Sequence, residues 1–458
     1  MKCNKLITSA LLALGLVSSA SAASSVTLNG TNYTVVYITG STAFRGNVYT
    51  AVTSTVFDSN AYMTQGSPSS SAAAYNIYGT ISGTPTLLSF NWTGSEAGLA
   101  ALTATAISNP NTAGSLTNYS GGTVNLPGTP NATGYINAST GSGTVTAAAD
   151  LAFSDTSQAV SLSAAKPAFV DYGIVAIIPF TWGKGKLTGA QSSSYTNLVN
   201  VSTPQLKYLC GGQQIASFFT GQAGDTNNIY LIGRNKGSGT RVNMLLDTQK
   251  GTSASGTVDQ WVPADSYYAT TSQNALTFGT VEALTSAGGL VEVVNDGYDS
   301  GSGVVKTLAD DLNGSTDANG QVITVGYAGI SDWQGSGQGL AGGAVALTEN
   351  GVGESDGAVE TGTYSFWGHE HLYGVHGQST TSAGGVVALY LTGSAYNVSQ
   401  GTLSTAAGPL ESSFGTGGGR EANPFSHAAA TGTASSALDP AVVHANKPSD
   451  AGYPSQQN

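Results

Sequence analysis

In the stretch Leu231-Ile232-Gly233-Arg234-Asn235-Lys236-Gly237-Ser238-Gly239-Thr240, an apolar run typical of a strand leads into a polar, glycine-rich loop. Apolar residues then recur with helical spacing at Val242, Leu245 and Leu246, and Gly251 is suited to end a helix. The stretch therefore predicts a strand, a loop and a helix whose first turn begins in the loop.

Two earlier stretches repeat this strand–loop–helix pattern. The first is Ile38-Thr39-Gly40-Ser41-Thr42-Ala43-Phe44-Arg45, followed by apolar residues at every fourth position, Val48, Val52 and Val56. The second is Phe90-Asn91-Trp92-Thr93-Gly94-Ser95-Glu96-Ala97-Gly98. We therefore expect a helix to begin at each of these loops.

Along the whole chain, short apolar runs alternate with stretches of helical spacing. The strand-like runs are 33–39, 86–91, 173–180, 229–233, 290–294 and 321–326, and the helix-like stretches are 44–56, 97–107, 204–219 and 241–249. Strands that alternate with helices indicate an α/β fold with largely parallel sheets. Residues 109–146 and 415–458 are dense in small polar residues and predict a surface insertion and a loose C-terminal segment.

The three loops share the chemistry of an anion site. The first turn of a helix leaves backbone N–H groups without partners, and the helix dipole is positive at that end. Glycine lets the backbone approach a ligand closely, and hydroxyl groups add donors. One such loop is usually an ordinary helix cap, whereas three favour an oxyanion site. Arg234 adds a guanidinium that can hold an oxyanion with two parallel hydrogen bonds.

A fourth polar segment, Ala152-Phe153-Ser154-Asp155-Thr156, bears on the selectivity of such a site. A Ser-Asp pair in isolation is more often a turn or a cap. Beside an anion site, however, a carboxylate repels a fully ionised ligand and accepts a hydrogen bond from a protonated one. Because monohydrogen phosphate carries a proton and sulfate does not, Asp155 would favour phosphate.

Composition and the N-terminal residues narrow the class of protein. Residues 1–22 hold two lysines, an apolar stretch and a final Ala20-Ser21-Ala22, which is the pattern of a cleavable signal peptide. No lipid-attachment cysteine follows the apolar stretch, so we expect a periplasmic or secreted protein. The formal net charge of -12 argues against nonspecific binding of nucleic acid. Cys210 would be the only cysteine after cleavage, which excludes an intrachain disulfide.

Taken in order, these segments resemble the phosphate-binding proteins of bacterial ABC transporters, which are type II periplasmic binding proteins. The similar segments are 40–44, 94–98, 153–155, 172–180, 197–221, 234–240 and 325–330. The most specific of them is 234–240, which is similar to the family's Arg-x-Asp-x-Ser-Gly-Thr loop.

The resemblance implies two α/β lobes with two crossover strands and a ligand cleft between the lobes. It places residues 23–172 in the first lobe, 173–330 in the second, and 331–458 in the returning part of the first lobe and the C-terminal segment. It also implies a monomeric solute-binding protein, not an enzyme, which binds inorganic phosphate or a related oxyanion without a cofactor and delivers it to an ABC transporter permease. The ligand contacts that it implies are Ser41, Thr42, Ala43, Phe44, Ser95, Asp155, Arg234, Ser238, Gly239 and Thr240.

This chain departs from the family pattern in the loop after Arg234. Lys236 stands where the family has an aspartate that orients the arginine. A second cation in that place leaves sulfate or a larger phosphorylated ligand open. The insertion 109–146 lies between the second loop and Asp155, where it could cover the cleft.

Other functions find less support in the sequence. Gly368-His369-Glu370-His371 with His376 is the only cluster with metal-ligand chemistry, and it lacks the four ligands of a structural zinc site. Ser238 lies between glycines but does not match the Gly-x-Ser-x-Gly motif of a nucleophile. The alternative that remains is a secreted surface or matrix protein that keeps the binding-protein fold with weak or altered ligand binding, an interpretation favoured by the 9% of charged residues and by Lys236.

Overall fold

The computed structural model describes residues 25–28, 31–54, 56–58, 62–63, 74–103, 107–108, 115–116, 119–122, 144–147, 149–253, 255–263, 278–282, 289–294, 296–310, 315–334, 339–392, 396–397, 402–403, 445–446 and 455–456. The predicted signal peptide and most of the segments 109–146 and 415–458 lie outside these residues.

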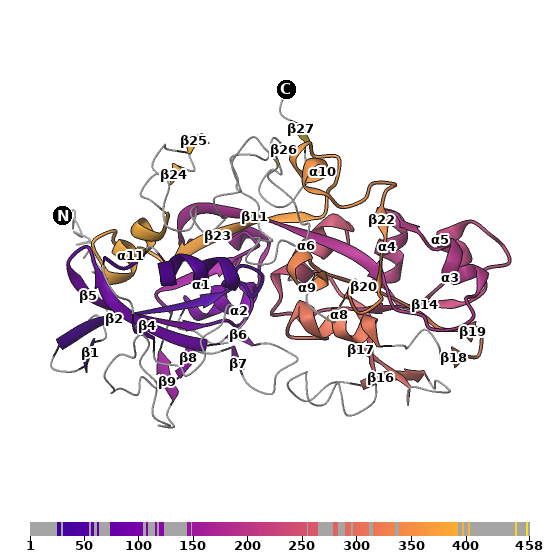
Figure 1. Ribbon diagram of the computed structural model, residues 1–458, viewed down its shortest axis with the longest axis horizontal. Helices are drawn as coiled ribbons and strands as arrows, with labels where there is room; N and C mark the ends of the chain where they lie inside the picture. Colours follow the sequence, from indigo (N-terminus) through magenta and orange to yellow (C-terminus); the bar gives the residue numbers. More distant parts are fainter. Residues whose placement is uncertain are drawn as a thin grey trace, which may run out of the picture.

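The main sheet contains twelve strands. In spatial order they are β13 (Gln214–Ile215), β14 (Asn228–Ile232), β20 (Ile323–Gly329), β11 (Val170–Lys184), β23 (Trp367–Gly374), β10 (Leu151–Ser154), β2 (Thr31–Gly40), β5 (Thr84–Asn91), β4 (Ala74–Ile81) and β3 (Tyr62–Met63). In addition, β1 (Ser25–Leu28) pairs with β2, and β21 (Val345–Ala346) pairs with β11. The sheet therefore runs through both lobes, with β11 and β23 in its middle (Figure 1).

Helices cover the sheet in each lobe (Figure 1). The first lobe, around β2 and β5, carries α1 (Arg45–Ser54), α2 (Ser95–Ala101) and α11 (Ala383–Thr392). The second lobe, around β14 and β20, carries α3 (Ser193–Asn197), α4 (Thr203–Leu209), α5 (Ser217–Thr220), α6 (Gly239–Asp247), α8 (Gly301–Ala309) and α9 (Ile330–Trp333). The remaining helical segments are the 3-10 helix η1 (Gln158–Val160) and α10 (Asp356–Glu360).

Smaller sheets complete the described structure. One has three strands, β15 (Asp259–Pro263), β17 (Leu290–Val294) and β16 (Phe278–Glu282). The paired strands are β12 (Asn200–Val201) with β22 (Thr348–Glu349), β18 (Thr316–Asp317) with β19 (Gly320–Gln321), β6 (Ile107–Ser108) with β7 (Ser115–Leu116), β8 (Tyr119–Gly122) with β9 (Thr144–Ala147), β24 (Tyr396–Asn397) with β25 (Thr402–Leu403), and β26 (Ala445–Asn446) with β27 (Ser455–Gln456).

The α/β class is confirmed, but the expectation of largely parallel sheets is wrong. β2 is parallel to β5 and β10, and β14 is parallel to β20. The pairs β11–β20, β11–β23 and β10–β23 are antiparallel. The physical reason is that the crossover strands β11 and β23 carry the chain between the lobes in opposite directions. Each is also antiparallel to a neighbour in one lobe, β11 to β20 and β23 to β10.

The two crossover strands form the connection between the lobes. β11 is 15 residues long, and it pairs first with β23 and then with β20 and β21. The β11–β23 register shifts between Asp171 and Ile174 and again between Ile174 and Ala176. Gly173, inside the first shift, has a φ of 115°, a conformation that suits glycine. Register shifts of this kind bend a strand, so β11 bends where the chain leaves the first lobe.

Strand pairing also locates the return of the chain to the first lobe. β21 pairs with the end of β11, and β22 pairs with β12, so residues 345–349 lie beside the second lobe. The chain then crosses back along β23, later than residue 331, which was the predicted start of the return. The other lobe boundaries stay predictions.

Two predicted helices differ from the observed ones. The stretch 204–219 is not one helix, because α4 ends at Leu209 and β13 intervenes before α5. Gly212, with a φ of 128°, lies at this interruption. The helix predicted over 97–107 is shorter in the structure, since α2 ends at Ala101 and Ile107 belongs to β6. None of the described helices has the length and apolar character needed to cross a membrane.

Candidate functional site

Two of the predicted loops lie against the end of β10. The Ser41 amide donates to the Phe153 carbonyl at 2.9 Å, and the Gly94 amide donates to the Gly40 carbonyl at the same distance. A β-carbon on Gly98 would lie 2.6 Å from the Gly40 Cα, so α2 begins almost in contact with the first loop. The loops after β2, β5 and β10 are therefore adjacent because their strands are neighbours and run parallel.

The third loop reaches this group from the second lobe. The Glu96 amide donates to the Gly237 carbonyl at 3.2 Å, and the Asn243 side-chain amide donates to the Asp155 carbonyl at 2.8 Å. A β-carbon on Gly94 would lie 2.6 Å from the Gly237 carbonyl oxygen. The structure therefore brings the three sequence-predicted loops together at the junction of the lobes.

Asp155 lies at the centre of this junction and is 1% exposed. Its Oδ1 accepts a hydrogen bond from the Ser95 hydroxyl at 2.6 Å. A β-carbon on Gly239 would lie only 1.5 Å from the same Oδ1 and 2.7 Å from the Ser95 Cβ, so this position accommodates only glycine. The Asp155 carboxylate thus lies against the first turn of α6, where the helix dipole favours a negative charge.

Arg234 is buried in the same junction, and the backbone of the second lobe fixes it. Its Nε donates to the Tyr298 carbonyl at 3.1 Å, and its Nη2 donates to the Asp299 carbonyl at 2.8 Å. Its Nη1 lies 3.5 Å from the Thr240 hydroxyl oxygen. Burial lowers the pKa of Arg234, while the carboxylates of Asp332 and Asp155 act in the opposite direction.

Asn235 and Lys236 follow Arg234 in the third loop. The Asn235 side chain donates to the Asp299 carboxylate, and its Oδ1 accepts from the Gly237 amide at 3.0 Å. Lys236 itself is half-buried, and burial and then the charge of Arg241 lower its pKa. Arg234 is therefore oriented by the backbone carbonyls of residues 298 and 299.

Two charged residues that the sequence analysis did not select belong to this junction. Arg45 begins α1, and its pKa is lowered by burial, raised by Asp332 and lowered by Arg234. Burial raises the pKa of Asp332, whereas Arg234 and Arg45 lower it. The Asp332 carboxylate lies at the start of α8, because a β-carbon on Gly301 would be 2.0 Å from its Oδ2. The charge of Asp332 therefore favours the charged form of both arginines.

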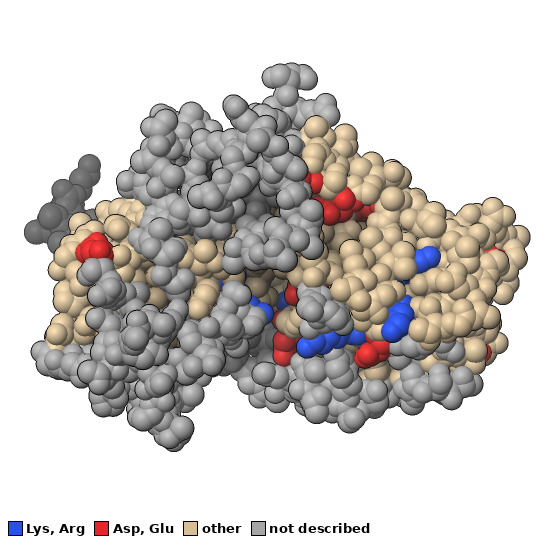
Figure 2. Space-filling model, in the orientation of Figure 1, with Lys and Arg blue, Asp and Glu red and all other residues tan. Residues whose placement is uncertain are grey.

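Charged atoms are also exposed on the surface near this junction. Figure 2 shows basic and acidic atoms close together at the junction of the lobes, on a face whose other described atoms are mostly uncharged. The sequence offered a signal for Arg45, which directly follows the first loop. It offered none for Asp332, because the charge of that residue acts on Arg234 only in the folded chain.

The other predicted contacts have structural roles in the described state. Phe44 is buried, and its ring packs on Phe153 with centroids 5.7 Å apart. The Ser238 hydroxyl caps α6 by accepting from the Arg241 amide at 3.2 Å. Thr42 and Ala43, in the turn before α1, are partly exposed. Contacts from these residues to a ligand stay predictions.

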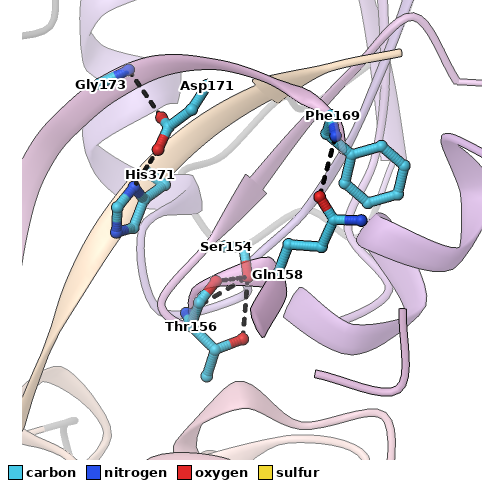
Figure 3. Close-up of polar contacts among 7 residues, drawn as sticks. All are labelled: Ser154, Thr156, Gln158, Phe169, Asp171, Gly173 and His371. Atoms are coloured by element: carbon cyan, nitrogen blue, oxygen red, sulfur yellow. Dashed lines mark hydrogen bonds and ion pairs between the residues drawn. The ribbon is translucent and has the colours of Figure 1, made fainter. Parts of the chain in front are cut away.

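The histidines of the Gly368–His371 motif lie on the crossover strand β23. His369 and His371 form part of a row of aromatic side chains along one face of the strand, with Trp367 and Tyr373 at its ends. The His371 Nδ1 lies 3.1 Å from an Asp171 carboxylate oxygen, which joins β23 to β11 beside the register shift (Figure 3). Among the described residues, no group of three or more His, Cys, Asp or Glu side chains is arranged to hold a metal ion.

The segment after β10 is held by its own side chains. The Ser154 hydroxyl donates to the Thr156 carbonyl at 2.8 Å, and the Phe169 amide donates to the Gln158 side chain at 2.8 Å (Figure 3). Glu96 joins this segment to α2, because its Oε2 accepts from the Leu162 amide at 2.7 Å. Burial raises the pKa of Glu96 to about 8.

This pKa gives a prediction for stability. Since the folded pKa of Glu96 lies above the value of an unfolded glutamate, the folded state binds the extra proton between about pH 4.5 and pH 8. The free energy of unfolding should therefore fall as pH rises through this range. We expect Glu96→Gln to remove about 1 to 3 kcal/mol of that fall, measured by urea unfolding of both proteins at pH 5, 6.5 and 8. Equal pH dependence in both proteins would show that Glu96 does not keep its proton.

Comparison with known proteins adds little to this geometry. No family model matches the chain, and no curated protein matches it. Among solved structures, it is similar to an ABC-type phosphate transport receptor from Vibrio cholerae at 13% identity, with a TM-score of 0.36, over 77% of this chain and 92% of that one. It is also similar to a phosphate-binding protein from Stenotrophomonas maltophilia at 15% identity, with a TM-score of 0.34, over 74% of this chain and 78% of that one. At these values the likeness does not establish a ligand for this chain.

Proposed function

We propose that this protein is an extracytoplasmic solute-binding protein that captures inorganic phosphate, or a related tetrahedral oxyanion, at the junction of its lobes. The observation that carries the proposal is the meeting of Ser95, Asp155 and the first turn of α6 beside the buried Arg234. Hydrogen-bond donors, a fixed cation and one carboxylate acceptor then lie within one small region. This combination suits an oxyanion that carries a proton.

The described state also supports a mechanism of capture. The Asp155 carboxylate lies against Gly239 of the other lobe, so an oxyanion can reach the first turn of α6 only after the lobes separate. The bend of β11 and its pairing with β23 offer the hinge for that movement. A ligand that bridges the two lobes would stabilise a closed form that includes it, and a membrane transporter would then recognise that form.

Isothermal titration calorimetry tests the proposal directly. The chain without residues 1–22 is titrated with phosphate, arsenate, sulfate and nitrate at pH 7. We expect one phosphate to bind per chain with a Kd of about 10 μM or tighter, and sulfate to bind at least about tenfold more weakly, a difference of roughly 1.4 kcal/mol. If no tetrahedral oxyanion binds with a Kd below about 1 mM, the proposal is wrong.

One observation favours the alternative, a secreted surface or matrix protein that keeps this fold with weak ligand binding. Polar groups that the proposal assigns to a ligand already bond within the protein, as the Ser41 amide does with Phe153 and the Ser95 hydroxyl does with Asp155. If these polar groups are already hydrogen-bonded in the closed state without a ligand, a ligand has to replace those bonds, and the affinity of the protein for an oxyanion is lower. Absence of oxyanion binding in the calorimetry, with a normally folded protein by circular dichroism, would favour this function.

A further inference from the structure

A carboxyl group that the proposed function does not use lies behind Asp155. Glu370 is in the middle of β23 and is fully buried. Side chains two residues apart on a strand point to the same face of the sheet, so Glu370 shares its face with Gly368. A β-carbon on Gly368 would lie 2.8 Å from the Asp155 carbonyl oxygen and 2.6 Å from Asn243. Glu370 therefore points to the side of the sheet on which the proposed anion site lies.

The groups around Glu370 contain one carboxylate and no strong cation. Asp155, which follows β10, repels a negative charge on Glu370, and His371 on the same strand favours it. The Ser41 side chain, which follows β2, also favours the charged form. The facing residue of β11 is Ala176, which is uncharged, and Asn243 of α6 lies beside Gly368, two residues earlier on the same strand. No Lys or Arg forms a salt bridge with Glu370 in the described part of the chain.

These surroundings decide the protonation state of Glu370. A buried carboxylate without a cation is very unfavourable, and two neighbouring carboxyl groups do not both ionise readily. Burial, followed by the charge of Asp155, raises the pKa of Glu370 well above its ordinary value, and the opposing effects of Ser41 and His371 are smaller than that of burial. These surroundings therefore favour the uncharged acid form of Glu370 over its carboxylate.

From this placement we propose that Glu370 couples anion affinity to a proton: its uncharged carboxyl group lets the site accept an anion beside Asp155, and its ionisation expels that anion. This inference rests on the proposed function. An ionised Glu370 would place a second negative charge behind Asp155 and weaken the attraction of Arg234 for an oxyanion. By linkage, a bound anion would in turn raise the proton affinity of Glu370. Anion binding and proton binding would then support each other.

The test compares the phosphate affinity of the wild-type chain with that of Glu370→Gln from pH 6 to pH 9.5. Glutamine is similar in size and cannot ionise. The ionisation of phosphate itself is the same for both proteins, so the ratio of the two Kd values isolates Glu370. We expect the ratio of wild-type Kd to variant Kd to rise at least tenfold over this range. Glu354→Gln is the matched control, because burial raises the pKa of Glu354 to about 7, yet this residue follows β22 and none of the loops of the site.

The possible outcomes separate this inference from the proposed function. A Kd ratio that stays constant from pH 6 to pH 9.5 would overturn the role of Glu370 while leaving phosphate binding intact. The same rise in the Glu354→Gln control would overturn it as well, because the effect would then not be specific to the site. Failure of both proteins to bind phosphate at any pH would instead contradict the proposed function.

If Glu370→Gln does not fold, a second experiment on the wild-type chain replaces this comparison. Phosphate and sulfate compete for the site, and the proton uptake that accompanies binding is measured in two buffers. Binding without proton uptake at pH 9 would overturn the inference.

Discussion

Replacing Arg234 with alanine is expected to weaken phosphate binding by about 2 to 5 kcal/mol, a loss of roughly 30-fold to several thousandfold. The guanidinium is buried, and two backbone carbonyls hold it in one orientation, so little ordering is left to occur when a ligand arrives. Its removal would also take away a positive charge that acts on the carboxylates of Asp332 and Asp155. The variant therefore loses the attraction between the guanidinium and the bound anion. It also leaves the repulsion between that anion and the two carboxylates less well balanced.

The measurement is calorimetry with phosphate at pH 7, with thermal unfolding as a check on the fold. Arg234→Lys keeps the charge but lacks the planar donor pair, so its affinity should lie between those of wild type and alanine variant. Lys207→Ala removes an exposed cation on α4 and serves as the control for a change in net charge. A loss below about tenfold in a folded Arg234→Ala protein would place the arginine outside the binding site.

The second large effect is expected at Asp155. Asp155→Asn should weaken phosphate binding by about tenfold to a hundredfold, since a hydrogen bond to a charged group contributes about 1.5 to 3 kcal/mol. Sulfate, which has no proton to donate, should bind more tightly to the variant, because the repulsion by the carboxylate is gone. The preference for phosphate over sulfate should narrow accordingly.

Titration of both proteins with both anions measures this change in preference. Asn keeps the size of the side chain and an oxygen that can accept from the Ser95 hydroxyl, so the contact with Gly239 is retained. Asp171→Asn offers a matched control, because this carboxylate bonds His371 at the bend of β11 and not the anion site. Unchanged selectivity in Asp155→Asn would contradict its role as a discriminating acceptor.

Local sequence signals predicted the loops of the site well. The apolar run before Gly40 forms β2, and Val48 and Val52 lie on the buried face of α1. Ser95 begins α2, and Ser238 caps α6, as the spacing of apolar residues indicated. These features depend on neighbours within about four residues, which the chain displays directly.

Features that depend on distant segments were not predicted. The antiparallel crossover pairs followed from the assembly of the sheet and not from any one strand. Glu370 was considered only as part of a metal motif, because its relation to Asp155 requires β10 to lie beside β23. Its neighbour His371 likewise meets Asp171 only across the β11–β23 pair.

The sequence by itself determined where strands pass into helices, and hence where backbone amides and small polar side chains gather, because hydrophobic periodicity and turn residues act over a few positions. Only the tertiary structure decided which charges face one another. The free energy of burying a charge depends on the groups around it. Those groups come from strands that are far apart in the chain. That is why Arg234 is held by the carbonyls of residues 298 and 299 and favoured in its charged form by Asp332, and why the surroundings of Glu370 favour its uncharged form.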